Sequence, residues 1–423
     1  MATEELAVRL HGEEVGALVK LRNGRVSFVF DPRYARQRSR PVLGLSFLDP
    51  SGEVREGRRA STGGGRSPPY FANLLPEGHL RSYLAAKAGV AETLDFPLLR
   101  LLGRDLPGAV EMIGVGAQAP SASEGDDPRD HADRPGLLRF SLAGVQLKFS
   151  AVAEASGGLT VPARGMGGDW VVKLPSSRFD GVPENEFSVM RMAAMCGIET
   201  PEVRLVPVAD VAGLPGDLSG EWMDGRQALA VRRFDRAADG RRVHTEDFAQ
   251  VFGQYPEAKY DGFGYRDIAR VLGAFAGGDA LGEFSRRLIY SAMVGNADMH
   301  LKNWSLIYRE PTQSELSPAY DLLSTTACIS DEAMALRLGG AKRWDELTLA
   351  DFAEIGEHAF VGGDAMVGPA VETVERFRTV WLQERHHLPL STAVAKAIDR
   401  QLNTVPAASP GRRMARRRER GGH

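Results

Sequence analysis

The sequence predicts an α+β fold, with a small N-terminal β-rich subdomain followed by a bilobal core whose second lobe is helical. Apolar and polar residues alternate at the start of the chain, as they do in half-buried strands. A stretch nearly free of large apolar residues interrupts the chain at 116–136. From about residue 245 onward, apolar residues recur at helical spacing. These three observations together define the predicted organisation.

The N-terminal subdomain is expected to cover residues 1–115. The segment "LAVRLHGEEVGALVKLRNGRVSFVFD", at 6–31, predicts an antiparallel meander with turns at "HGEE" and "RNGR". The segment "RPVLGLSFLD", at 40–49, is expected to add a strand. Helix signals in "PYFANLLPEGHLRSYLAAKAG" and a helix followed by a strand in "TLDFPLLRLLGRDLPGAVEMIGV" complete this part.

The segment 116–136 is rich in Ala, Ser, Pro and Asp, which predicts a flexible linker or surface loop and marks a domain boundary. The first lobe, 137–244, has strand signals and one helix in "ENEFSVMRMAAMCGI". The second lobe, 245–405, is predicted to be helical, and 406–423 is a basic tail that we expect to be disordered. Its expected helices include "YRDIARVLGAF", "LGEFSRRLIYSAMVG", "LTLADFAEIGEHAF" and "PAVETVERFRTVWLQER".

The bulk composition is that of a soluble globular protein, because 43% of the 423 residues are hydrophobic. No apolar run is long enough for a membrane span, and the acidic N-terminus lacks the apolar centre of a signal peptide. Cys196 and Cys328 are too few for a disulfide framework or a zinc site. We therefore expect a cytoplasmic protein without membrane contact.

The charge is unevenly distributed along the chain. The last fifteen residues contain six Arg and one Glu, so they carry +5 and leave −8 on the rest of a chain whose net charge is −3. An acidic body argues against a broad nucleic-acid footprint. The tail is expected to be a solvated terminus, and contact between it and nucleic acid stays open.

The most informative stretch is "GNADMHLKNWSLIY", at 295–308, which follows an apolar helix. Four residues separate Asp298 from Asn303, as in the catalytic loop of protein kinases. There the Asp orients a hydroxyl and accepts its proton, and the Asn gives an oxygen to Mg²⁺. His300 and Lys302, between them, could steady the transferring phosphate.

The same stretch is compatible with two other interpretations. One is an ordinary loop that ends a helix, since the spacing alone is common. The other is an iron-type site of two His and one carboxylate, with Asp298, His300 and His244 as ligands. We rank the metal site low because the usual short His pairings are absent.

The remaining parts of a phosphotransferase occur in the chain order that protein kinases use. Lys173 ends the strand-like run "DWVVKLP" and is predicted to hold the α- and β-phosphates of ATP. Glu184 and Glu186 follow at the start of a helix; we favour Glu186 for the kinase glutamate, although either fits as a partner of the helix dipole. Asp321, in "LSPAYDLLS", is predicted to be the second Mg²⁺ ligand, and a turn Asp is the alternative. This order predicts a protein-kinase-like core that uses ATP and Mg²⁺.

Several motifs together resemble the HipA family of serine/threonine kinases, which are toxins of bacterial toxin–antitoxin systems. The resemblance runs from about residue 5 to about 390 and rests on "YFANLLPEG", "FSLAGVQLKFS", "WVVKLP", "ENEF", "VRRFDR", "HTEDFAQ", "KYDGFG", "GNADMHLKNWSLIY" and "SPAYDLLST". It implies transfer of the ATP γ-phosphate to Ser or Thr of a protein. The target it implies is an aminoacyl-tRNA synthetase, such as glutamyl-tRNA synthetase, whose modification inhibits translation and growth.

The resemblance also assigns residues near the nucleotide. Ser141 matches a serine that such kinases autophosphorylate, which ejects the adjacent phosphate-covering loop at 142–148. In that loop, Gly144 allows backbone N–H groups to approach phosphate, and Gln146 and Lys148 are implied contacts.

The stretch "AVRRFDR" matches the hinge that contacts adenine. Its implied nucleotide contacts are Val231, Arg233, Phe234 and, at the nucleotide's edge, Asp235.

The implied partner is a HipB-like antitoxin, a small helix-turn-helix dimer, through which contact with operator DNA mainly occurs. Two other functions remain as alternatives: a small-molecule phosphotransferase with a kinase-like site, and a non-catalytic corepressor scaffold. The motif around Ser141 and the additional N-terminal module favour the HipA-like kinase over the small-molecule enzyme.

Overall fold

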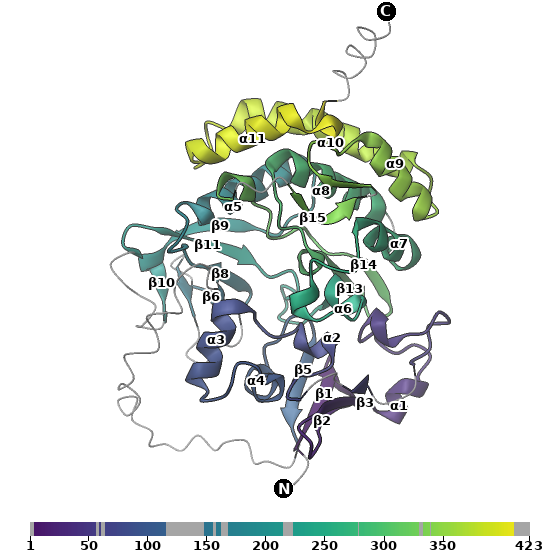
Figure 1. Cartoon of the computed structure of the whole chain (residues 1–423). Coiled ribbons are helices and arrows are strands. Elements are labelled where there is room, and N and C mark those ends of the chain that lie inside the picture. The colour runs from purple at the N-terminus through teal and green to yellow at the C-terminus, as the bar shows by residue number, and fades with distance from the viewer. Residues whose placement is uncertain are drawn as a thin grey trace, which may run out of the picture. The chain divides into compact units, whose positions relative to one another are not determined.

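A computed structural model of the chain divides into two units (Figure 1). Unit 1 comprises Met1–Asp180, Pro207–Arg226 and Asp235–Pro256, and unit 2 comprises Gly181–Val206, Gln227–Phe234 and Glu257–His423. The structure describes residues 4–55, 59–60, 64–115, 148–154, 158–161, 168–214, 223–277, 279–329, 333–338 and 340–409. The predicted linker and most of the predicted tail lie outside these residues, and the predicted domain boundaries stay predictions.

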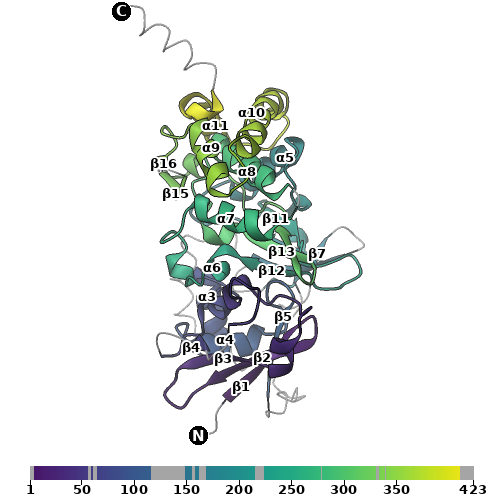
Figure 2. The same ribbon diagram turned by 90° about the vertical axis from the view of Figure 1, so that its right-hand side faces the viewer.

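Unit 1 begins with a five-stranded sheet in the order β4-β3-β2-β1-β5 (Figure 2). Its strands are β1 (Glu4–Leu10), β2 (Glu13–Lys20), β3 (Val26–Phe30), β4 (Arg59–Ala60) and β5 (Val110–Gly114). The predicted meander is confirmed, because β1, β2 and β3 pair antiparallel in sequence. At the second turn Gly24 has a φ of 78°, and the Asn23 side chain accepts a hydrogen bond from the backbone N–H of Arg25 at 3.1 Å.

The strand expected at 40–49 is wrong. Leu45–Phe47 forms a short 3-10 helix (η1), and only an isolated bridge joins Leu48 to Val54. The backbone N–H of Leu45 donates to the Glu246 carboxylate at 3.0 Å, so it is not available for a ladder. The apolar residues of this stretch reach the core from one helical turn and not from an extended strand.

Aromatic rings fill the core under this sheet. The ring of Phe28 lies 4.8 Å from that of Phe71 and 5.6 Å from that of Phe47, whose ring is 4.9 Å from Tyr70. All four residues are buried, so each removes a large apolar surface from water. The helices of this part are α1 (Pro32–Arg36), α2 (Pro69–Ala72), α3 (Gly78–Lys87) and α4 (Asp95–Leu102).

The rest of unit 1 contains strands in the order β10-β7-β6-β8, with β6 and β8 antiparallel. These are β6 (Lys148–Ala153), β7 (Leu159–Thr160), β8 (Trp170–Lys173) and β10 (Val211–Ala212). A further strand, β12 (His244–Asp247), leads into α6 (Phe248–Val251). Asp247 and Gln250 form a capping box, which explains why the helix begins at this point.

Unit 2 is built around α8 (Ala280–Val294), a helix with buried residues on all its faces. α10 (Asp364–Glu384) and α11 (Thr392–Thr404) both pack against α8 (Figure 1). The ring of Tyr290 on α8 meets Phe377 of α10 edge-on at 5.3 Å, and its hydroxyl donates to the Val189 carbonyl at 2.6 Å. The helix is therefore a rigid support for whatever follows its C-terminus.

The predicted helices of unit 2 are confirmed, and the α+β class with them. The remaining helices are α5 (Val182–Met195), α7 (Tyr265–Phe275) and α9 (Leu349–His358). The strands are β9 (Val203–Pro207), β11 (Gln227–Arg232), β13 (Ser305–Glu310), β14 (Gln313–Leu316), β15 (Ala333–Leu338) and β16 (Ala341–Arg343). The hairpins β13–β14 and β15–β16 were not predicted, because short apolar runs do not distinguish a strand from a helix. Among the helices of the described residues, none is both long and apolar enough to cross a membrane.

His244 in β12 makes the stability of the protein depend on pH. Burial lowers the pKa of this imidazole to about 4, even though its Nε2 lies 2.9 Å from the Leu43 carbonyl. The unfolded chain takes up the proton near pH 6.5, so stability is lost as the pH falls from 6.5 towards 4. Between pH 7 and 4 this protonation should lower the free energy of unfolding by about 3 kcal/mol. We expect His244→Phe to abolish this loss, as measured by urea unfolding. The prediction is contradicted if the free energy of unfolding of His244→Phe depends on pH as strongly as that of the wild type and of the exposed-site control, His386→Gln.

Candidate active site

The candidate site begins where α8 ends, at Gly295. This residue has a φ of 69°, and a Cβ there would lie 2.2 Å from Thr326 Oγ1, so only glycine fits. Its carbonyl accepts hydrogen bonds from the backbone N–H groups of Thr325 at 3.1 Å and Thr326 at 3.2 Å. The end of the helix is thereby joined to a turn thirty residues later in the chain.

Asn296 connects two of the predicted site residues. Its side-chain Oδ1 accepts from the backbone N–H of Asp298 at 3.1 Å, and its Nδ2 donates to the backbone carbonyl of Asp321 at 3.2 Å. Asn296 has no exposed surface, so its side-chain amide is shielded from water. Asp298 and Asp321, distant in sequence, are therefore held by one amide.

Asn303 holds the same loop from its other end. Its Nδ2 donates to the Asp298 carbonyl at 2.7 Å, and its backbone N–H donates to the His300 carbonyl at 2.9 Å. The spacing of Asp298 and Asn303 thus has a structural reason, since a single turn of 3-10 helix, η6 (Leu301–Asn303), closes the loop between them.

The Asp298 carboxylate is the exposed reactive group of this loop, because 47% of its side chain is accessible. Tyr260 donates its hydroxyl hydrogen bond to Asp298 Oδ1 at 2.6 Å. The Tyr260 ring meets the His300 ring edge-on at 5.0 Å, and His300 Nε2 lies 3.9 Å from Asp298 Oδ1. A carboxylate oriented in this way can accept a proton from a hydroxyl placed beside it.

His300 is a neutral imidazole in this setting. Burial, followed by the nearby Lys259 ammonium, lowers its pKa to about 3. At neutral pH it therefore contributes a hydrogen-bonding group and no positive charge. Its Nδ1 is buried and has no hydrogen-bond partner among the described residues, which leaves a polar atom that a ligand could satisfy.

Tyr320 joins Lys302 to the predicted hinge. Its hydroxyl donates to the Lys302 carbonyl at 2.8 Å and lies 2.6 Å from Ser305 Oγ, and its ring is 5.6 Å from that of Phe234. Within unit 2, Phe234 and the loop that carries Lys302 therefore share one aromatic neighbour.

The segment from Asp321 to Thr326 is held at three points. Asp321 has a φ of 54°, which is unusual for a residue with a side chain and is tolerated best by Asp and Asn. Asn296 holds its carbonyl, and the turn at Thr325 is held by Gly295. Between them, Asn185 of α5 donates to the Ser324 carbonyl and accepts from its N–H, both at 3.0 Å. Such fixed, strained backbone is found at functional sites.

Burial distinguishes the two glutamates of α5. Glu186 is 2% exposed, whereas Glu184 is only partly buried. A carboxylate is rarely buried so completely unless other groups interact with it. This difference supports the choice of Glu186, which stays a prediction.

Two predicted phosphate contacts lie in unit 1. Lys173 ends β8 and is buried, and Lys148 begins β6 as an exposed residue. They are directly opposite each other in the β6–β8 register, so both side chains point to the same face of the sheet. Ser141, Gly144 and Gln146 lie outside the described residues.

The predicted hinge begins within β11. Val231 is buried within this strand, and Arg233 and Phe234 follow it. Asp235 belongs to unit 1, where its Oδ2 accepts from the backbone N–H of Gly108 at 2.8 Å and from Arg236 Nη1 at 2.9 Å. These contacts show what the carboxylate binds within the protein; the nucleotide contact stays a prediction.

The residues present fit a magnesium ion in their chemistry. Because Asn303 Nδ2 is engaged by Asp298, the amide oxygen is the atom that a cation can use. Asp321 adds a carboxylate, and Mg²⁺ prefers oxygen ligands of these two kinds. Within the described part of the chain, no group of three or more His, Cys, Asp or Glu could hold a metal, which excludes the iron-type site with His244.

Sequence reasoning did not assign roles to Tyr260, Asn296, Thr325 or Tyr320. Tyr260 lies in "KYDGFG" and Asn296 in "GNAD", so both stand inside motifs that carried the family resemblance. Their hydrogen bonds to Asp298, Asp321 and Lys302 become visible only in the folded chain.

Comparison with known proteins identifies the family. Residues 6–113 match the family model of the HipA N-terminal domain, and residues 140–381 match that of the HipA-like C-terminal domain. The chain belongs to the HipA family. A relative from Sinorhizobium fredii, a putative kinase named Y4dM, is 48% identical over 412 residues, which are 95% of this chain and 97% of the relative.

More distant HipA relatives agree with this. The serine/threonine-protein kinase toxin HipA of Shewanella oneidensis is 28% identical over 294 residues, 60% of this chain and 62% of that protein. A HipA-family fold is seen in a solved complex of HipA, HipB and operator DNA from Shewanella oneidensis. It matches with a TM-score of 0.69 and 21% identity, and covers 95% of this chain and 96% of that one.

Asn185 is expected to anchor the Asp321 segment of this HipA-family chain. Asn185→Ala leaves a buried N–H and a buried carbonyl of Ser324 without partners, which should lower the free energy of unfolding by about 3 kcal/mol. Urea unfolding measures this. Asn403→Ala, on the exposed surface of α11, is the matched control and should change stability by less than about 0.5 kcal/mol. Equal losses in the two variants would refute the anchoring role.

Proposed function

We propose that this HipA-family chain is a serine/threonine protein kinase that transfers the γ-phosphate of ATP to a protein hydroxyl. The observation that carries the proposal is the half-exposed Asp298 carboxylate on a buried frame that also holds Asn303 and Asp321. Family membership supports the same activity, because relatives are named kinases.

The proposed reaction uses this frame in a defined way. The hydroxyl oxygen forms a bond to the γ-phosphorus as the bond to ADP breaks, and Asp298 accepts the hydroxyl proton. Tyr260 keeps Asp298 Oδ1 in position. Asn303 and Asp321 would hold magnesium, which would supply positive charge to neutralise the phosphates. Lys173 binds the α- and β-phosphates, with Lys148, Gly144 and Gln146 of the phosphate loop.

Other residues complete the proposed site. Glu186 serves as the kinase glutamate, while His300 and Lys302 contact the transferring phosphate. The hinge contacts adenine through Val231, Arg233 and Phe234, and Asp235 lies at the nucleotide's edge. Autophosphorylation of Ser141 is the proposed means of self-regulation.

The proposed partners follow from the family. A HipB-like helix-turn-helix antitoxin binds this chain and mediates its contact with operator DNA, as HipB accompanies HipA in the Shewanella oneidensis complex. The proposed protein target is an aminoacyl-tRNA synthetase, with glutamyl-tRNA synthetase as the first to test. Its modification would inhibit translation and growth, and the site of action would be the cytoplasm.

The activity is tested by incubating the chain with Mg-ATP and locating phosphate by mass spectrometry. We expect phosphate on Ser141 of the wild type. With Asp298→Ala the reaction should be slower by about 10²-fold or more, because the proton acceptor is lost. Both proteins must unfold at similar urea concentrations. The protein-kinase proposal is refuted if the protein carries no phosphate itself and phosphorylates a small alcohol. If Asp298→Ala inhibits growth as strongly as the wild type, the result favours a non-catalytic scaffold.

Tyr260 gives a second, more graded test. Tyr260→Phe keeps the ring beside His300 and removes the hydrogen bond to Asp298 Oδ1, so kcat should fall about tenfold. Tyr83→Phe, which keeps its ring near Lys87 on α3, is the control and should retain the wild-type kcat. A rate with Tyr260→Phe equal to or above that of the wild type would mean that the hydroxyl does not orient Asp298.

A further inference from the structure

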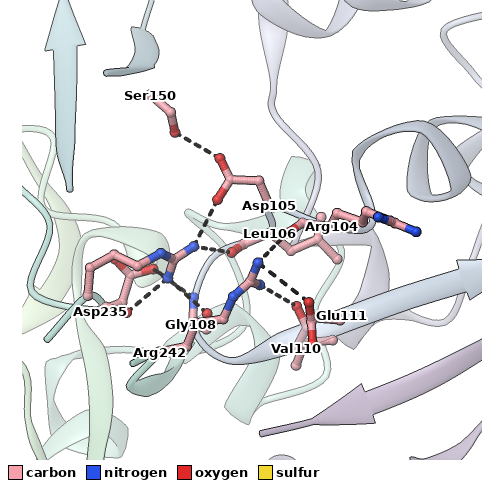
Figure 3. A network of polar contacts seen from close by, with 10 residues as sticks. Arg104, Asp105, Leu106, Gly108, Val110, Glu111, Ser150, Asp235 and Arg242 are labelled. Atoms are coloured by element: carbon pink, nitrogen blue, oxygen red, sulfur yellow. Dashed lines mark hydrogen bonds and ion pairs between the residues drawn. The ribbon is translucent and has the colours of Figure 1, made fainter. Parts of the chain in front are cut away.

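A network of charged groups joins three segments of unit 1 (Figure 3). The first is the loop from Asp105 to Val110, which leads from α4 into β5 and belongs to the HipA N-terminal domain. The other two belong to the C-terminal domain: β6, at Ser150, and the segment 235–242, which precedes β12. The network therefore lies where the two family domains meet inside one compact unit.

Arg236 is the centre of this network and is almost fully buried. Its Nη2 donates to Asp105 Oδ1 at 2.9 Å and to the Leu106 carbonyl at 3.2 Å. Its Nη1 donates to Asp235 Oδ2 at 2.9 Å and to the Gly108 carbonyl at 3.1 Å. The side chains of Arg236 and Asp105 are only 9% and 6% exposed, so these bonds form away from water.

Each of the two acids makes a further hydrogen bond. Asp105 Oδ2 accepts from Ser150 Oγ at 3.1 Å, and Asp235 Oδ2 accepts from the backbone N–H of Gly108 at 2.8 Å. Figure 3 shows Asp105 between Ser150 and the guanidinium that contacts Asp235. One short loop of the N-terminal domain thus contacts both β6 and the end of the predicted hinge.

The backbone of the loop is fitted to this contact. Gly108 has a φ of 71°, and a Cβ on it would lie 2.8 Å from the backbone nitrogen of Thr245. Only glycine allows this approach. Arg242 forms a second link, with Nη1 3.5 Å from the Val110 carbonyl and Nη2 3.6 Å from Glu111 Oε1. The loop is therefore held by several independent contacts.

A buried ion pair is a poor means of adding stability, because the cost of removing two charges from water offsets their attraction. Apolar side chains of similar volume stabilise such a position as well. What the charged network adds is geometry, since each hydrogen bond fixes a distance and a direction. The positions it fixes are relevant to the proposed nucleotide site: Ser150 is two residues from Lys148, and Asp235 directly follows Phe234.

We propose that Asp105 and Arg236 are positioning residues through which the N-terminal domain sets the geometry of the ATP site. In this role the Asp105 loop holds β6 and the end of the hinge in the arrangement that binds the nucleotide. The N-terminal domain is then a part of the nucleotide-binding machinery. This inference rests on the proposed kinase function and on the assignment of the hinge and of Lys148 to ATP.

Steady-state kinetics with Mg-ATP separate positioning from simple stabilisation. Asp105→Asn weakens the pairing with Arg236, and we expect KM for ATP to rise about tenfold with a smaller change in kcat. Asp105→Glu, which keeps the charge, should restore part of the affinity. Arg241→Gln breaks the exposed pair with Asp239 in the same segment and should leave both constants unchanged.

A milder variant covers the case in which Asp105→Asn does not fold. Ser150→Ala removes the hydrogen bond to Asp105 without removing a charge and should raise KM for ATP about threefold in a folded protein. The proposal is overturned if the folded variants keep the wild-type KM, or if KM rises equally with Arg241→Gln. A wild-type chain that neither binds ATP nor transfers phosphate overturns the proposed function itself, which is a different outcome from an active wild type with unaffected variants.

Discussion

The candidate site depends on one buried amide, that of Asn296. An amide has both a donor and an acceptor in one plane, and here the acceptor takes the Asp298 N–H while the donor reaches the Asp321 carbonyl. A carboxylate lacks the donor, and an apolar side chain lacks both. The residue stands two positions after the last residue of α8, so this deeply packed helix of unit 2 determines where these two acids lie.

The buried groups described above follow one physical rule. A charge that is buried has several hydrogen-bond partners, as Arg236 does, and a titratable group that cannot be satisfied as an ion is neutral, as His300 and His244 are. Asp298 differs, because its backbone is fixed while half of its carboxylate faces solvent. This combination of a rigid frame and an accessible charge is what proton transfer requires.

Much of the fold could be predicted from periodicity. The meander β1–β3 and the helices α5, α7, α8, α9 and α10 were recognisable because apolar residues recur in each of them at strand or helix spacing. The expected strand at 40–49 was wrong because a tertiary contact, from Leu45 to Glu246, decided its backbone. The hairpin β13–β14 was missed for a related reason: its short apolar run has no period of its own, and its partner strand defines it.

The sequence by itself determined the candidate residues of the proposed site and their chain order: Lys173, Glu186, Asp298, Asn303 and Asp321, each in a recognisable motif. Only the tertiary structure decided which polar atoms meet. It placed the Tyr260 hydroxyl on Asp298 and joined Asp235 through Arg236 to a loop more than a hundred residues earlier. A hydrogen bond depends on distance and direction in space, and local spacing along the chain constrains neither between residues so far apart.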